Sequence, residues 1–153
     1  MDDAGTIPDD AGGGSADRDR IVGVLYAYAD ALDRRDWPAL TDVFSPGVRA
    51  EYGGTEHTDG RAELVAMIRG YLDSCGPTQH LMGNPRATVA GDSATASVKM
   101  RVHHAAAADP STTYECFGWY HARLEHTDAG WRIVRWRQEV THELGTHEVF
   151  GRG

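Results

Sequence analysis

Three features are scarce in this chain of 153 residues, and each scarcity excludes a class of protein. No apolar run approaches the roughly 20 residues of a transmembrane helix, so we expect no membrane partner. Only 15 basic residues stand against 23 acidic ones, and the net charge of −8 argues against a nucleic-acid partner. Two cysteines, Cys75 and Cys116, make no disulfide framework, and we expect reduced thiols in a cytoplasmic protein.

The N-terminal segment differs in composition from the rest of the chain. It is acidic and glycine-rich and has no apolar core, so we do not expect a secretory signal. Such a segment cannot bury enough apolar surface to offset the entropy of ordering it. We therefore expect a disordered tail over residues 1–16, one domain over 17–144, and a C-terminal tail or lid over 145–153.

Hydrophobic residues recur at helical spacing in the first third of the domain. Ile21, Leu25, Tyr28 and Leu32 form one stripe and predict a helix over residues 17–36, which Trp37-Pro38 ends. A short helix over 38–44, a strand over 48–52 and a polar loop over 53–60 follow. A further helix is expected over 61–74, with Asp59 as its N-cap.

The hydrophobic period changes to two after residue 77. Strands are expected over 78–90, 94–104, 114–125 and 131–142, the first interrupted at 83–85. Helices followed by an antiparallel meander predict an α+β fold, with the helices packed on one face of a curved sheet.

The alternation also predicts which polar side chains point inward. His104 shares parity with Met100 and Val102, and Tyr120 shares parity with Cys116. The last strand is ambiguous, because Trp131 and Ile133 share parity with Arg135 while Val134 shares it with Trp136.

Asp33 and His80 each have two interpretations from spacing alone. Asp33 borders the apolar helix stripe with Tyr26 but also precedes a charged helix end, and His80 stands beside apolar residues where a structural histidine is common. His103 and His104 cannot chelate one ion together, because adjacent strand residues point to opposite faces. With no CxxC and no HExxH motif either, we expect no metal site.

Three segments, taken in order, resemble the SnoaL-like branch of the NTF2-like superfamily, and scytalone dehydratases most of all. They are Leu32-Asp33-Arg34-Arg35-Asp36-Trp37, Pro77-Thr78-Gln79-His80-Leu81-Met82-Gly83 and Asp128-Ala129-Gly130-Trp131-Arg132-Ile133. The resemblance covers about residues 18–142. It implies a cone: a strongly curved mixed or antiparallel sheet and N-terminal helices that enclose a deep pocket.

The resemblance also implies a set of site residues. Matching motif to motif assigns an Asp–His pair to Asp33 and His80, a second histidine to His104 and a tyrosine to Tyr52. Substrate-binding tyrosines are expected at Tyr28 and Tyr120, and Tyr26 is added from its place beside the stripe. The chain departs from the family pattern at Leu32, where scytalone dehydratases have tyrosine, at Gly118, where they have serine, and at Tyr120, where they have asparagine. Trp136 stands where a related dehydrochlorinase has arginine, so the position of Arg135 and Arg137 stays open.

This constellation suits removal of a proton next to a carbonyl. His80 would be the base, Asp33 would hold its tautomer, His104 would protonate or hydrogen-bond the departing hydroxyl, and tyrosines would polarise the carbonyl. The expected function is a cofactor-independent dehydratase acting on a cyclic, polyketide-like or other hydrophobic hydroxyketone. The alternatives are a cyclase or isomerase on the same pocket and a non-catalytic small-molecule-binding protein.

Self-association is also expected. Phe117, Trp119 and His121 share the face opposite Tyr120, and an exposed aromatic stripe of this kind often marks an interface. Family members associate through this sheet face, so we expect a homotrimer or homodimer. The other interpretation is that helices cover these side chains.

Overall fold

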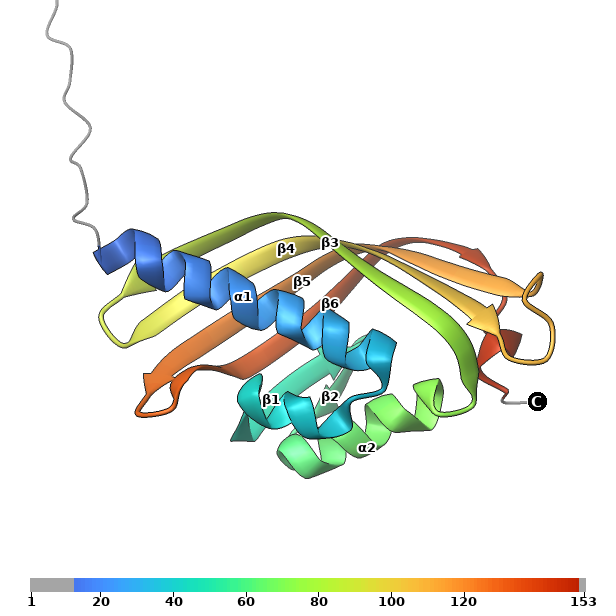
Figure 1. Ribbon diagram of the computed structural model, residues 1–153, viewed down its shortest axis with the longest axis horizontal. Coiled ribbons are helices and arrows are strands. Elements are labelled where there is room, and N and C mark those ends of the chain that lie inside the picture. Colours follow the sequence, from blue (N-terminus) through green and yellow to red (C-terminus); the bar gives the residue numbers. More distant parts are fainter. Residues whose placement is uncertain (1–12, 152–153) are drawn as a thin grey trace, which may run out of the picture.

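The computed structural model describes residues 13–151, which fold into helices packed under a six-stranded sheet (Figure 1). The elements are α1 (Gly13–Arg34), the 3-10 helix η1 (Trp37–Asp42), β1 (Phe44–Tyr52), β2 (Thr55–His57), α2 (Arg61–Leu72), β3 (Cys75–Ala90), β4 (Ser93–Ala106), β5 (Thr113–Thr127), β6 (Gly130–Gly145) and the 3-10 helix η2 (His147–Phe150). None of the helices within this range is long and apolar enough to cross a membrane.

The sheet has the strand order β2-β1-β6-β5-β4-β3. Neighbouring strands are antiparallel except β1 and β6, which are parallel. The long strands β3 to β6 curve together, and α1 lies across their concave side with α2 and η1 beside it (Figure 1). The expected α+β fold with a curved mixed sheet is confirmed.

The predicted apolar stripe of α1 faces this concave side. Ile21, Leu25, Tyr28 and Leu32 are each at most 2% exposed, because a spacing of three to four residues places them on one side of the helix. Against them pack large side chains of the sheet, among them Trp136, whose ring centroid lies 4.8 Å from that of Tyr28. Tight packing of this helix on the sheet fixes the position of every residue that α1 contributes to the site.

A β-bulge in β6 decides the inward face that the sequence left ambiguous. Leu124 of β5 pairs with Ile133, but Arg123 pairs with Arg135, so Val134 is an extra residue in β6. A bulge of this kind shifts the alternation by one position. Ile133 and Trp136 are therefore both buried, whereas Arg135 lies outside.

A second bulge follows in the same strand. Gly118 pairs with Val140 and Phe117 pairs with His142, which makes Thr141 the extra residue. The two backbones are so close here that a Cβ atom on Gly118 would lie 1.8 Å from the Glu139 carbonyl oxygen. Glycine therefore replaces the family's serine for a steric reason.

Several expected boundaries differ from the structure. Residues 1–12 of the expected tail lie outside the described range, but residues 13–16 belong to α1. Asp17 therefore lies inside the helix, where its carboxylate accepts a hydrogen bond from Trp131 Nε1 (3.1 Å). Gly60, not Asp59, is the N-cap of α2, and the expected polar loop contains the short strand β2.

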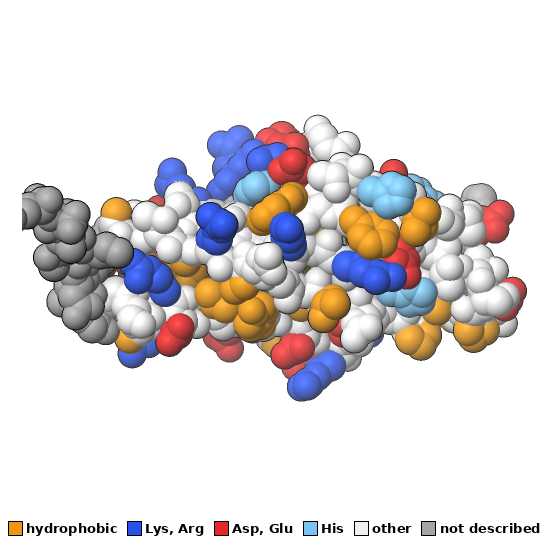
Figure 2. All heavy atoms as spheres, turned by 90° about the horizontal axis from the view of Figure 1, so that it is seen from above, with side chains coloured by type: hydrophobic (Ala, Val, Ile, Leu, Met, Phe, Trp, Pro, Cys, Tyr) orange, Lys and Arg blue, Asp and Glu red, His pale blue; other side chains and the backbone are white. Residues whose placement is uncertain are grey.

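The outer face of the sheet carries the predicted aromatic stripe. Lys99 lies over the Trp119 ring at 5.3 Å and Arg101 over the Phe117 ring at 5.2 Å. Figure 2 shows hydrophobic side chains interspersed with Lys, Arg and His on this side. The helices lie on the concave side (Figure 1), so they do not cover these rings, and association through this face remains a prediction.

Candidate active site

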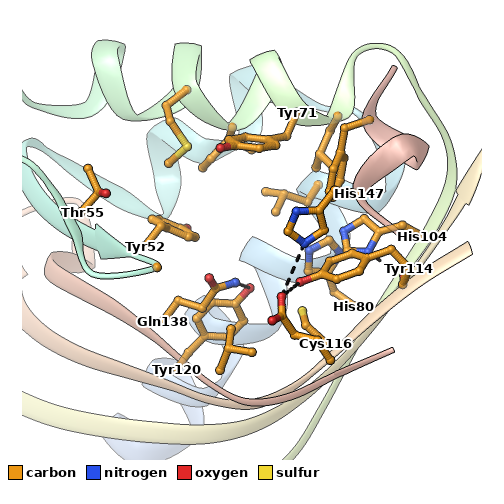
Figure 3. A pocket seen from close by; sticks show the side chains of 18 of the residues that line it. Tyr52, Thr55, Tyr71, His80, His104, Tyr114, Cys116, Tyr120, Gln138 and His147 are labelled. Carbon is orange, nitrogen blue, oxygen red and sulfur yellow. Dashed lines mark hydrogen bonds and ion pairs between the residues drawn. The ribbon is translucent and has the colours of Figure 1, made fainter. Parts of the chain in front are cut away.

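A cavity of about 430 Å³ lies between the concave side of the sheet and the helices. Most of its wall is apolar or aromatic, which is typical of a small-molecule site. The lining residues are Tyr28, Leu32, Tyr52, Gly53, Thr55, His57, Met67, Ile68, Tyr71, Leu72, His80, His104, Tyr114, Cys116, Tyr120, Gln138, Val140, Glu143, His147 and Phe150 (Figure 3). The sequence predicts seven residues that act on or bind the substrate. Five of them line this cavity, namely Tyr28, Tyr52, His80, His104 and Tyr120, and the other two, Asp33 and Tyr26, do not.

Asp33 holds His80 from behind the cavity wall. His80 Nδ1 lies 2.6 Å from Asp33 Oδ1, and the His80 backbone N–H donates to Oδ2 at 2.8 Å. The His80 side chain is only 5% exposed and lines the cavity, whereas Asp33 does not. Since Nδ1 is occupied by Asp33, Nε2 is the ring nitrogen left for the cavity side.

The carboxylate of Asp33 is held by more than the histidine. Arg35, at the end of α1 with a left-handed φ of 56°, donates to Thr78 Oγ1 at 2.9 Å and to the carbonyl oxygen of Gly76 at 2.8 Å. Arginine can only donate, so Thr78 accepts this bond and turns its own hydroxyl hydrogen toward Asp33 Oδ1, 2.9 Å away. This series of hydrogen bonds, from Arg35 to Thr78, Asp33 and His80, thus joins the end of α1 to the start of β3.

These bonds keep Asp33 ionised. Burial alone raises the pKa of this carboxyl, but the hydrogen bonds and charge of His80, together with the Thr78 hydroxyl, lower the pKa below its ordinary value. An ionised carboxylate only accepts hydrogen bonds, so the proton of neutral His80 resides on Nδ1. His80 Nε2 then carries a lone pair on the cavity side.

His104 is the buried histidine that strand parity predicted. It is 6% exposed, its Nδ1 lies 3.2 Å from the Tyr114 carbonyl oxygen, and its ring centroid is 6.0 Å from that of His80. Burial and the neighbouring His80 lower the pKa of His104 to about 4. At neutral pH His104 is therefore uncharged, and because Nδ1–H donates to a carbonyl oxygen, Nε2 is an acceptor.

Phenol groups form another part of the wall. The hydroxyls of Tyr28 and Tyr52 lie 2.8 Å apart, and Trp136 Nε1 donates to Tyr52 at 2.9 Å. Tyr120 stacks on Trp136 at 4.5 Å, and Gln138 Nε2 lies 3.5 Å from its hydroxyl. Burial raises the pKa of Tyr28, Tyr52 and Tyr120 above that of a free phenol, so all three stay protonated donors.

The wall on the side of His104 contains residues that the sequence did not reveal. Tyr114 O–H donates to Glu143 Oε1 at 2.5 Å, and His147 Nε2 lies 3.4 Å from the same oxygen (Figure 3). Phe150 of η2 packs on His104 with ring centroids 5.1 Å apart. Tyr114 is two positions from Cys116, so strand parity already contained the signal for it. Glu143 and Gln138 had no such signal, because the bulges of β6 decide their face.

Two sequence expectations need correction or completion. Tyr26 is wrong as a substrate-binding residue: it is 41% exposed and outside the cavity, because two positions along a helix turn it to the side opposite Tyr28. Arg135 and Arg137, left open by the sequence, lie outside the lining as well. Arg135 pairs with Glu56 at 2.5 Å, and Arg137 lies 3.8 Å from Glu139.

A metal site needs several ligating side chains that converge on one point. Within residues 13–151, no three side chains of His, Cys, Asp or Glu converge in this way. Cys75 and Cys116 are both buried and unpaired, and burial raises the pKa of Cys116 to about 11, so its sulfur is a thiol and not a thiolate.

Comparison with known proteins identifies the family. A model of the SnoaL-like domain matches residues 14–137, and the chain therefore belongs to the SnoaL-like domain family. The uncharacterized protein Rv2910c of Mycobacterium tuberculosis (strain H37Rv) is 30% identical over 121 residues, which are 78% of this chain and 82% of that protein.

Solved structures show the same fold at low sequence identity. An NTF2-like protein with a cystatin-like fold from Novosphingobium aromaticivorans superposes with a TM-score of 0.65 and 24% identity, covering 83% of each chain. A proposed scytalone dehydratase from the same organism superposes with a TM-score of 0.72 and 18% identity, covering 83% of this chain and 85% of that one. The fold is thus NTF2-like.

Proposed function

We propose that this protein is a cofactor-independent dehydratase, a hydro-lyase that removes water from a cyclic or polyketide-like hydroxyketone. The observation that carries the proposal is the Asp33–His80 pair, with Asp33 behind the wall and His80 in it. The arrangement fixes the tautomer of the imidazole that serves as base, with the proton on Nδ1 and the Nε2 lone pair on the side of the cavity. A base held in this way contributes about 10²–10⁴-fold to a proton transfer.

In the first step, His80 Nε2 removes the proton on the carbon next to the carbonyl. The C–H electron pair becomes the enolate double bond, and negative charge develops on the carbonyl oxygen. Asp33 stabilises the imidazolium that forms, as a buried carboxylate does in hydrolase triads. Within the Tyr52–Tyr28 pair one phenol donates to the other, and the O–H that remains supplies a hydrogen bond to the enolate oxygen, which strengthens as its charge grows.

In the second step, the enolate expels the hydroxyl group from the β carbon. The proton on His80 Nε2 goes to that hydroxide, so water leaves and His80 is again neutral. His104 does not supply this proton, because a pKa of about 4 leaves only about one His104 side chain in a thousand protonated at neutral pH. Its Nε2 instead accepts a hydrogen bond from the hydroxyl group and orients it.

The reaction changes no oxidation state overall, so the chemistry draws only on side chains of the cavity wall. Further support is the name of the structural neighbour assigned as a scytalone dehydratase, which describes this type of reaction. The phenol pair and the histidine pair both belong to the wall of the cavity (Figure 3), which would place the carbonyl and the departing hydroxyl between them.

Incubation with a panel of cyclic β-hydroxyketones, followed by mass spectrometry, tests this proposal. We expect the wild-type protein to release the mass of one water molecule from at least one of them and His80→Gln to lose this activity. His103→Gln is the matched control, since His103 lies next to His104 on the outer face and pairs with Glu115 at 2.9 Å. Conversion without a change of mass would identify an isomerase or cyclase instead. Binding without conversion would overturn catalysis altogether.

A further inference from the structure

Hydrogen-bond donors and hydrogen-bond acceptors lie in different parts of the cavity wall. The hydrogen-bonded Tyr52–Tyr28 pair has one O–H left to donate, whereas His104 Nε2 and the Glu143 carboxylate present acceptors. Figure 3 shows Tyr52 and the group around His104 on different sides of the open space. A ligand that satisfies both groups has an acceptor at one end and donors at the other.

The cavity wall contains an acidic side chain but no lysine or arginine. None of the lining residues is Lys or Arg, so an anionic ligand finds no cation to replace its lost hydration. Glu143 is the only Asp or Glu among the lining residues, and the hydrogen bond from Tyr114 is the main reason that its pKa lies below the ordinary value. Glu143 is therefore negative at neutral pH.

One oxygen of this carboxylate remains for a ligand. Tyr114 donates to Oε1, and His147 also approaches Oε1, so both contacts fall on the same atom. The side chain is 52% exposed, which places it where the cavity opens to solvent. Tyr114 and His147 thus hold the group by Oε1, which leaves Oε2 for a ligand.

We propose that Glu143 forms an outer subsite that binds a hydroxyl or phenol donor of a neutral substrate and rejects a carboxylate at the same position. The inference rests on the proposed function in one respect, since it takes the Tyr52–Tyr28 pair as the carbonyl site. It assigns the substrate class more narrowly: a neutral ketone with a second hydroxyl group remote from its carbonyl. Loss of one hydrogen bond to a half-exposed charged group is expected to weaken binding about tenfold.

Binding of three matched bicyclic ketones tests this subsite. The probes are 6-hydroxy-1-tetralone, 6-methoxy-1-tetralone and 1-tetralone-6-carboxylate, measured by isothermal titration calorimetry. None has a hydroxyl group β to the carbonyl, so none can be dehydrated, and binding is observed apart from catalysis. For the wild-type protein we expect the hydroxy probe to bind about tenfold more tightly than the methoxy probe and the carboxylate to bind most weakly.

Two variants separate hydrogen bonding from charge. Glu143→Ala should abolish the preference for the hydroxy probe, and Glu143→Gln, which is neutral, should bind the carboxylate more tightly than the wild type does. Glu139→Ala is the matched control, because Glu139 is on the same strand but pairs with His121 on the outer face at 2.6 Å. Both sites are at least partly exposed, so the three variants are expected to fold.

The subsite proposal is overturned if Glu143→Ala keeps the preference, if the wild type binds the carboxylate as well as the hydroxy probe, or if none of the probes binds. Its failure is distinguishable from failure of the proposed function. Discrimination among the probes without dehydration of any hydroxyketone refutes only the dehydratase. Dehydration without discrimination refutes only the Glu143 subsite.

Discussion

Replacing Asp33 with asparagine is expected to stop the proton transfer while leaving the fold intact. The carboxylate accepts three hydrogen bonds: from the His80 ring, from the His80 backbone and from the Thr78 hydroxyl. Asparagine has one oxygen and one NH2 group in the same volume. The backbone N–H of His80 can only donate, so it selects the orientation with the amide oxygen at the Oδ2 position. The NH2 group then lies at the Oδ1 position.

This orientation reverses the tautomer of His80. Nδ1 must accept a hydrogen bond from the asparagine NH2 group, so the histidine proton moves to Nε2 and the cavity loses its base. Thr78 Oγ1 can accept from the same NH2 group with its second lone pair, so the only hydrogen bond lost is the one that the Thr78 hydroxyl donates to Asp33, and we expect the fold to remain. We expect the rate of proton abstraction to fall by about 10²–10⁴-fold, the usual contribution of a positioned base.

Exchange of the α-protons of 1-tetralone with D2O, followed by proton NMR, measures this step without a leaving group. The tautomer is read separately from the ¹⁵N chemical shifts of His80, with Nδ1 protonated in the wild type and Nε2 protonated in Asp33→Asn. An Asp33→Asn protein that exchanges at the wild-type rate would refute His80 as a base held by Asp33. Loss of exchange with Nδ1 still protonated would refute the tautomer argument specifically.

Three further predictions concern the surroundings of this pair. His104 has a pKa of about 4 when folded and about 6.5 when unfolded, so its folded form takes up a proton less readily. Urea unfolding should therefore show full stability above about pH 6.5 and a loss of about 3 kcal/mol toward pH 4, which is absent in His104→Gln. Thr78→Val should raise the pKa of Asp33 and slow the exchange of 1-tetralone protons, whereas Thr78→Ser should restore both. Gly118→Ala should lower the unfolding free energy by at least about 1–3 kcal/mol in thermal or urea denaturation, since its Cβ would overlap the Glu139 carbonyl oxygen. Unchanged stability there would mean that the two strands can separate at the bulge without cost.

Local periodicity predicted those parts of the fold that depend on neighbours in the sequence. The stripe of Ile21, Leu25 and Leu32 and the inward face of His104 follow from helix and strand periods alone, and both are confirmed. Periodicity did not predict the parallel pairing of β1 with β6. The two strands are some 80 residues apart in the sequence, and the residues of a strand do not specify which other strand it pairs with. β2 was missed for a related reason: three residues are too few to show a period.

The site was predicted by a different route. Asp33 and His80 are 47 residues apart, and spacing alone left each with a structural interpretation, so only the family resemblance brought them together. Arg35 was expected to be solvated with the other charges of the helix end. In the structure its left-handed backbone turns the guanidinium toward Thr78 and three carbonyl oxygens, a conformation that no hydrophobic pattern encodes.

One extra residue in β6 is the main reason that the sequence does not predict which side chains of this strand face the cavity. In a regular strand, Trp131 and Ile133 would share their face with Arg135 and Arg137, and two guanidinium groups would enter the cavity. The bulge at Val134 reverses the face beyond it, so that Trp136 and Gln138 point inward and both arginines point away. The absence of Lys and Arg from the cavity wall, on which the proposed preference for a neutral ligand rests, therefore depends on strand register more than on composition. A sequence whose arginines alternate with its core residues still builds a pocket without a guanidinium group, because the alternation changes phase at Val134.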